Sequence, residues 1–456
     1  MDYYKLILRY FFPIIFTLPF LYFLNKIIKT QDVYYPAPQY FISIIAIGIL
    51  VLLTIVTIIV SFYGTELKKN TLLFFIVIGF CFYSAEFFLY FNNPGTKKPE
   101  TEKISTYDQR SLFKFIDDYD KDKNIVPFLS PDNFIFDTEN KDNLFTLSGI
   151  SNATTVHCNE NGYYSVYQSD MYGFNNPNKL WKDKRDKVIL LGDSFVHGSC
   201  VNYEDTIAGH MNNLQKKYSV LNLGYSGNGP LRSLATLVEY FEKTNTKHVF
   251  WFYYEENELT DDIYEELRHP LLPNYLISGP HPIIYEKYSQ NLINRQYLID
   301  QKLNSFLKEF INRLKKKYHN EGLPTQYQQM KIKDLLFFKL SREAIGQALK
   351  FRIPQENLEI FSTILDRSQE VLLSNNSKLY FVYLPSQVRY YKRHLNSQYL
   401  FSYDKIKKMV QEKNIEFIDY KHILDNTKNT LDYWGGGHLN ERGYRLLAEH
   451  ISNRIK

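Results

Sequence analysis

Residues 187–198 read KVILLGDSFVHG, and this stretch decides the fold. Its first half is a short, continuous apolar run, which is typical of a strand buried on both faces of a parallel sheet. Gly192 permits a tight turn after that run, so that Ser194 lies at the carboxyl end of the strand. Ligands of open parallel sheets bind beyond these strand ends. Ser194 is therefore a candidate nucleophile, although Asp and Ser are also common in turns and helix caps.

The chain after this stretch alternates between strand and helix patterns. Short apolar runs predict further strands at 220–223, 247–253, 378–384 and 415–419. Apolar residues at helical spacing predict helices at 204–217, 231–243, 358–373, 403–413 and 440–454. Such alternation implies crossover connections and a parallel sheet covered by helices on both faces, so the fold class is α/β. The alternation stops between about 260 and 354, where the pattern predicts a helical insertion.

The first ninety residues have the composition of membrane spans. Apolar runs at about 10–28, 40–63 and 71–91 approach or exceed the roughly 20 residues that a hydrocarbon core requires. A cleaved signal peptide is the less favoured interpretation, because no small-residue cleavage site follows the first run. We therefore expect a three-helix membrane anchor over 1–95, a linker and the first part of the soluble domain over 96–172, and the main domain over 173–456.

The charged residues limit the partners that we expect and leave the membrane orientation open. The chain has 54 Lys and Arg against 49 Asp and Glu, and this small excess argues against a dedicated nucleic-acid binder. The basic residues flank the apolar runs evenly, so the positive-inside rule does not fix the orientation. A cytoplasmic N-terminus and three crossings would place the soluble part on the extracytoplasmic side of an inner or plasma membrane.

The cysteines leave one open question. Cys158 and Cys200 are the two cysteines outside the apolar runs, and neither belongs to a CxxC or His-rich cluster. We therefore expect no metal site and no cofactor. A single disulfide between them is a hypothesis, which an oxidising compartment would favour.

Three more islands of polar residues follow predicted strands or precede the last predicted helix. LNLGYSGNGP at 221–230 contains Gly227, whose N–H can approach an oxyanion, although a plain glycine turn is the alternative. FWFYYEENEL at 250–259 contains Asn257, which is either an oxyanion donor or a helix cap. LDYWGGGHLNERGY at 431–444 contains His438, which is a candidate general base or an ordinary surface histidine.

In this chain order, the four islands resemble the SGNH or GDSL hydrolase superfamily. The resemblance lies in GDSF at 192–195, SGN at 226–228, EENEL at 255–259 and GHLN at 437–440. It implies a flavodoxin-like, three-layer α/β/α fold. It also implies that Ser194 attacks an ester carbonyl after His438 takes its proton. The Ser194 N–H, the Gly227 N–H and the Asn257 amide would then hold the oxyanion.

One residue departs from the pattern of this superfamily. The superfamily usually has an Asp three residues before the catalytic histidine, and this chain has Gly435 there. Asp432, Glu441 or a backbone carbonyl could orient the imidazole instead. Loss of the orienting carboxylate costs about 10⁴ in rate in a comparable triad. The conservative prediction is therefore a Ser–His dyad.

The substrate is suggested by a looser resemblance. The segment YQSDMYGFNNP at 167–177 is similar to one in membrane-tethered SGNH proteins that are associated with bacterial cell-surface polysaccharides. It implies an O-acyl group, most simply acetyl, on a glycan. Three functions remain open: a membrane-anchored esterase, an O-acyltransferase that needs a membrane partner, and a non-catalytic glycan-binding module.

Overall fold

The computed structural model describes residues 107–119, 125–131, 144–277, 289–319, 353–391 and 396–455, together with residues 73, 77, 81 and 83–88. The expected spans at 10–28 and 40–63 lie outside the described residues, as does most of the span at 71–91. Within the described part of the chain, no helix combines the length and the apolar character needed to cross a bilayer.

The central element is a five-stranded parallel sheet with the order β5-β4-β6-β7-β8. Counted in chain order within this sheet, the strands run 2-1-3-4-5, which is the flavodoxin-like arrangement. The predicted α/β parallel fold is thus confirmed, and each predicted strand is present within one or two residues. The strands are β4 (Lys187–Leu191), β5 (Ser219–Asn222), β6 (Thr246–Tyr254), β7 (Lys378–Leu384) and β8 (Glu416–Asp419).

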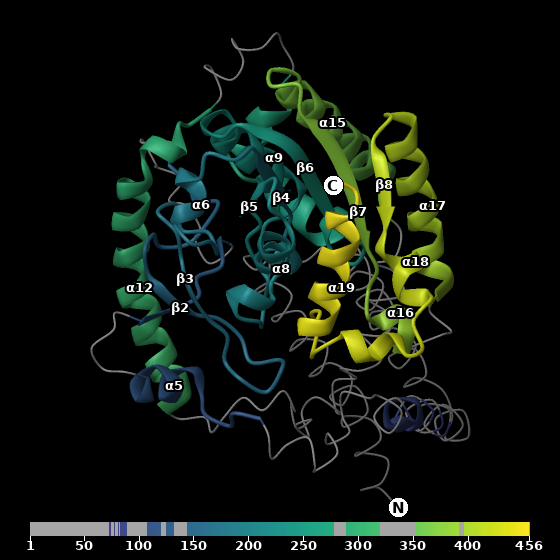
Figure 1. Cartoon of the computed structure of the whole chain (residues 1–456). Coiled ribbons are helices and arrows are strands. Elements are labelled where there is room, and N and C mark those ends of the chain that lie inside the picture. Colours follow the sequence, from purple (N-terminus) through teal and green to yellow (C-terminus); the bar gives the residue numbers. More distant parts are fainter. Residues whose placement is uncertain are drawn as a thin grey trace, which may run out of the picture. The chain divides into compact units, whose positions relative to one another are not determined.

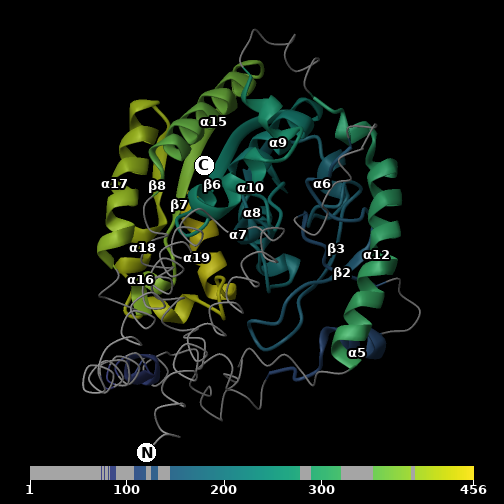
Figure 2. The same cartoon turned by 180° about the vertical axis from the view of Figure 1, so that it is seen from behind.

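Helices cover both faces of this sheet, so the architecture has three layers. One face carries α9 (Pro230–Tyr240), α15 (Gln355–Leu373) and α17 (Asn396–Glu412), with α9 and α15 in front of the sheet in Figure 2. The other face carries α7 (Ser194–His197), α8 (Ile207–Leu214), α18 (Tyr420–Asp425) and α19 (Glu441–Ser452), with α8 and α19 in front of the sheet in Figure 1.

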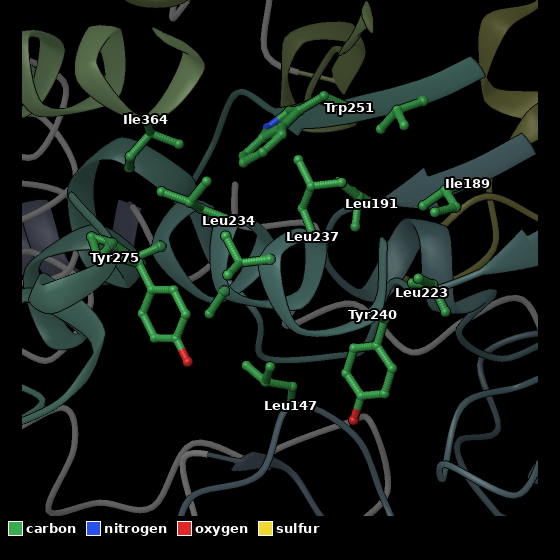
Figure 3. Packing of buried hydrophobic residues seen from close by; sticks show 14 of the residues in the cluster. Leu147, Ile189, Leu191, Leu223, Leu234, Leu237, Tyr240, Trp251, Tyr275 and Ile364 are labelled. Carbon is green, nitrogen blue, oxygen red and sulfur yellow. The ribbon is translucent and has the colours of Figure 1, made fainter. Parts of the chain in front are cut away.

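The alternation of side chains along each strand explains why both faces are covered. Ile189 and Leu191 of β4 pack with the first group of helices, whereas Val188 and Leu190 pack with the second. All four are fully buried, so neither face of the strand can be left to water. Figure 3 shows the first layer, in which Leu234 and Leu237 of α9 lie against strand residues that include Trp251.

A second, smaller sheet precedes the large one in the chain, and the sequence did not predict it. It consists of β1 (Ile125–Pro127), β2 (Thr154–Val156) and β3 (Val166–Gln168), with β1 parallel and β3 antiparallel to β2. Strands of three residues are too short to show an alternating pattern. Residues 100–324 and 352–456 form one compact unit, so this sheet belongs to the same unit as the large one.

The remaining elements are short or belong to the insertion. The described parts of the insertion are mainly helical, and Asp300 on its long helix α12 (Gln296–His319) accepts hydrogen bonds from the Ser151 N–H and Oγ beside the small sheet. The helices are α5 (Leu112–Asp118), α6 (Lys179–Lys182), α10 (Ile263–Leu267), α12 (Gln296–His319) and α16 (Val388–Tyr391). The single turns are η3 (Tyr203–Asp205), η4 (Phe241–Lys243), η5 (Glu258–Asp262), η6 (Leu272–Leu276), η7 (Leu292–Asn294) and η9 (Thr430–Tyr433).

Candidate active site

Ser194 lies where β4 turns sharply into α7. Gly192 makes this turn with a φ of 152°, and a Cβ there would lie 2.8 Å from a methyl carbon of Val196. The Asp193 carboxylate accepts the Phe195 N–H at 2.9 Å and so caps α7. Ser194 is the first residue of α7, and its N–H therefore has no carbonyl partner within the helix. The turn places both the hydroxyl and the N–H of Ser194 at the carboxyl edge of the sheet.

His438 contacts Ser194 directly, although the two residues are far apart in the chain. The His438 Nε2 and Ser194 Oγ atoms are 2.8 Å apart. The Gly435 N–H donates to the His438 carbonyl at 2.7 Å, which closes a tight loop before α19. Asn440 caps that helix by accepting the N–H groups of Arg442 and Gly443. The structure therefore brings together the two residues that the sequence predicted as nucleophile and base.

Glu160 is the third member of this hydrogen-bonded chain, and the sequence did not predict it. Both of its carboxylate oxygens lie 3.1 Å from His438 Nδ1. Its Oε2 also accepts the N–H groups of Gly437 at 2.7 Å and of His438 at 2.9 Å. An ionised carboxylate only accepts, so His438 Nδ1 carries the proton and Nε2 accepts from the Ser194 hydroxyl.

The surroundings of Glu160 keep it ionised. Burial alone would raise the pKa of Glu160, but the hydrogen bond and charge of His438 and the two backbone N–H groups outweigh it and lower this pKa to about 2. Asp432 and Glu441, the carboxylates proposed from the sequence, are the wrong residues. Asp432 accepts from Asn429 at 2.7 Å, and Glu441 accepts from the Tyr163 hydroxyl at 2.6 Å.

A side chain at position 435, where the superfamily usually has its acid, would clash with a neighbouring loop in this chain. A Cβ at Gly435 would lie 2.3 Å from Asn161 Oδ1, inside any contact distance. Asn161 has little freedom to move away, because its Nδ2 donates to the Cys200 carbonyl at 2.9 Å. The loop that brings in Glu160 therefore occupies the space of the side chain that the glycine lacks.

This loop connects β2 to β3, and several contacts fix it. The Tyr107 hydroxyl donates to the Glu160 carbonyl at 2.6 Å, and the Asp108 N–H donates to the Gly162 carbonyl at 2.8 Å. The disulfide left open by the sequence is present and joins Cys158 to Cys200. Glu160, Cys200 and His438 lie close enough to share a metal ion, but a sulfur bonded in a disulfide is not the thiolate that a metal site requires.

Gly227 and Asn257 follow β5 and β6, at the same edge of the sheet as Ser194. The Tyr225 N–H donates to the Gly192 carbonyl at 3.1 Å, which holds the Gly227 loop beside the nucleophile turn. Gly227 itself has a φ of 91°, which favours glycine. Asn257 Nδ2 donates to Asp262 Oδ2 at 2.8 Å, so one of its two amide hydrogens is used. The oxyanion role of these residues stays a prediction.

Two buried side chains form hydrogen bonds to the Gly227 loop, one before and one after Gly227 in the chain. His197 Nδ1 lies 3.0 Å from Ser226 Oγ, and burial lowers the pKa of His197 to about 3, so the ring is neutral. On the other side, the Glu266 carboxylate accepts the N–H groups of Gly229 and Leu231 at 2.8 and 2.7 Å. Burial raises the pKa of Glu266 to about 7.

The segment at 167–177 forms hydrogen bonds to elements that carry the site. Asn175 Nδ2 donates to the His197 carbonyl at 3.0 Å, and Asn176 Nδ2 donates to the Asn222 carbonyl at 2.8 Å. These bonds join the segment to α7 and to the end of β5. The prediction that this segment packs beside the sheet is confirmed, and its asparagines have a structural role there.

Comparison with known proteins finds only solved structures of low similarity. The sequence matches no protein-family model and no curated protein sequence. Among solved structures, the lipase/acylhydrolase from Enterococcus faecalis is 12% identical over 59% of this chain and 97% of its own, with a TM-score of 0.31. A member of the lipolytic protein G-D-S-L family from Veillonella parvula DSM 2008 is 14% identical over 59% and 97%, with a TM-score of 0.29. The acetyl xylan esterase AlAXEase is 13% identical over 59% and 100%, with a TM-score of 0.30.

Similarities of this size carry no argument about activity. The evidence for the chemistry of the site is therefore the set of contacts among Ser194, His438 and Glu160.

Proposed function

We propose that this chain is a serine ester hydrolase that works through an acyl-enzyme on Ser194. The observation that carries the proposal is the continuous hydrogen-bonded chain from Ser194 through His438 to Glu160. Nucleophile, base and orienting acid each have the partner that this chemistry requires. A glycan-binding module would need no such alignment, so the chain of contacts favours the two catalytic alternatives.

The reaction begins when Ser194 Oγ attacks the ester carbonyl and its proton moves to His438 Nε2. Glu160 holds the imidazole in the required tautomer and stabilises the imidazolium that forms. The alcohol leaves with the proton from Nε2, and the acyl group stays on Ser194. A water molecule then repeats the sequence, with His438 as base, and releases the acid.

The oxyanion that forms in each half-reaction needs donors at the edge of the sheet. The proposed donors are the Ser194 N–H, the Gly227 N–H and the remaining amide hydrogen of Asn257. Asp262 supports this assignment, because it accepts the other hydrogen of Asn257 Nδ2 and so orients the amide. A donor of this type contributes about 3 kcal/mol to the transition state.

We also propose a substrate and a location. The substrate is an O-acyl group, most simply acetyl, on a cell-surface glycan, as the segment at 167–177 indicates. The chain is held in an inner or plasma membrane through the expected helices at 10–28, 40–63 and 71–91, with its catalytic part outside the cytoplasm. The Cys158–Cys200 disulfide supports an oxidising compartment. Protease access to a tag near residue 110 on intact cells tests the orientation.

A fluorophosphonate probe and an acetylated sugar test the chemistry. The probe should label the full-length protein in detergent and leave Ser194→Ala unlabelled, and His438→Ala should lose turnover. Free acetate as the sole product, with and without an acceptor sugar, supports hydrolysis. Acetylated acceptor would instead support the O-acyltransferase, which would need a membrane partner. Equal labelling of wild type and Ser194→Ala would exclude the proposed nucleophile.

A further inference from the structure

The two cysteines of the Cys158–Cys200 disulfide lie close in sequence to Glu160 and to Ser194, the two outer residues of the hydrogen-bonded chain. Cys158 precedes Glu160 by two residues, and Cys200 follows Ser194 by six. The disulfide therefore connects the segment that carries the acid to the segment that carries the nucleophile. Cys200 is fully buried, whereas Cys158 is partly exposed in the β2–β3 loop, so the disulfide ties this loop to the interior of the fold.

The two connected segments belong to different sheets. Ser194 follows β4 and His438 precedes α19, so the five-stranded sheet and its helices position both of them. Glu160 lies in the loop between β2 and β3 of the small sheet. Its position relative to His438 therefore depends on the bonds between the two parts, which a conventional acid at position 435 would not require.

Two bonds beside Glu160 join its loop to the chain after Ser194. One is the disulfide itself, and the other is the hydrogen bond from Asn161 Nδ2 to the Cys200 carbonyl at 2.9 Å. Both involve Cys200, and they flank Glu160 in the loop. Opening the disulfide would leave the acid held by hydrogen bonds alone, among them its own bonds to Gly437 and His438.

We propose that Cys158 and Cys200 are positioning residues of the catalytic triad, and that ester hydrolysis depends on their disulfide through Glu160. This inference rests on the function proposed above. A dithiol reductant gives two electrons and two protons to the disulfide, which becomes two thiols, while the reductant closes its own disulfide. The freed loop then holds the Glu160 carboxylate less accurately against His438 Nδ1. A displacement of about 1 Å at a catalytic contact can cost on the order of 100-fold in rate.

The test is a cycle that combines reduction with loss of the acid. The parent is full-length Cys81→Ser, which leaves the disulfide as the single reducible site because the chain has three cysteines. Two proteins, this parent and its Glu160→Gln variant, are each assayed on an acetyl ester in the oxidised and in the reduced state. Alkylation and intact mass verify that reduction is complete. The double variant Cys158→Ser/Cys200→Ser repeats the comparison without reductant.

We expect reduction to lower kcat/KM by about 10- to 100-fold in the parent and by less than about twofold in Glu160→Gln. Unchanged activity after complete reduction would overturn the inference. So would an equal fold-loss in both backgrounds, which indicates general loosening or unfolding. Absence of hydrolysis by the oxidised parent would count against the proposed function instead.

Discussion

Replacing Glu160 by glutamine tests the triad with the least change of shape. The carboxylate accepts three N–H groups, from His438 Nδ1, Gly437 and the His438 backbone. Glutamine has one oxygen and one NH₂ group, so it cannot accept all three. If its oxygen faces the backbone N–H groups, its NH₂ group faces Nδ1, which favours the tautomer with the proton on Nε2. That tautomer cannot take the proton of Ser194.

The expected loss follows from this tautomer change and from the missing charge. We expect kcat/KM of Glu160→Gln to fall by about 10³- to 10⁴-fold, which is about 4–5.5 kcal/mol of transition-state stabilisation, with KM changed little. Steady-state hydrolysis of p-nitrophenyl acetate at neutral pH measures it. Glu441→Gln is the matched control, because Glu441 bonds Tyr163 and should matter less than about twofold. A loss below tenfold in Glu160→Gln would refute the assignment of Glu160 as the orienting acid.

Three further predictions concern the surroundings of the site. Gly435→Ala should lower the free energy of unfolding by about 1–3 kcal/mol, because its Cβ would clash with Asn161. Gly437→Ala is the control and should change the free energy of unfolding by less, because its Cβ would meet nothing nearer than 3.6 Å. Similar urea unfolding curves for the two variants would contradict the clash with Asn161. His197→Phe keeps a ring beside Tyr225 but removes the bond to Ser226, so kcat should fall about tenfold with KM unchanged, and an unaltered kcat would mean that the Gly227 loop does not need this bond. Because burial raises the pKa of Glu266, the folded state holds this proton at a pH where the unfolded chain has released it, and the contribution of Glu266 to stability falls as the pH rises towards about 7. Urea unfolding should therefore show a smaller advantage of wild type over Glu266→Gln at pH 7.5 than at pH 5, by about 1.4 kcal/mol per unit of pKa shift, and an equal advantage at both would disprove the shift.

The sheet was predictable because its signals are local. Each strand of the large sheet is an apolar run of a few residues, most of these runs are separated by helix patterns, and 187–198 contains both a strand and the nucleophile turn. Ser194 and His438 could be found because each lies within a short island of polar residues, and the four islands together, in their chain order, gave the two residues their roles. The small sheet had no such signal, because β1, β2 and β3 have three residues each.

Glu160 could not be found from local sequence, because its contact with His438 spans 278 residues. A combination of two weaker signals did point to it. Gly435 showed that the acid was missing from its usual place, and a Cys158–Cys200 pair would bring the residues after Cys158 close to Ser194. A search for a carboxylate near Cys158 would then have reached Glu160.

The origin of the acid in the β2–β3 loop also has a practical consequence for dividing the chain. Along the chain the triad runs acid, serine, histidine, whereas the four sequence motifs all lie after residue 173. A fragment that began at 173 would keep Ser194, His438 and the five strands of the large sheet, yet it would lack Glu160 and one half of the disulfide. We expect such a fragment to behave as a Ser–His dyad with a poorly oriented base. The functional unit is therefore longer than the unit that carries the recognisable motifs.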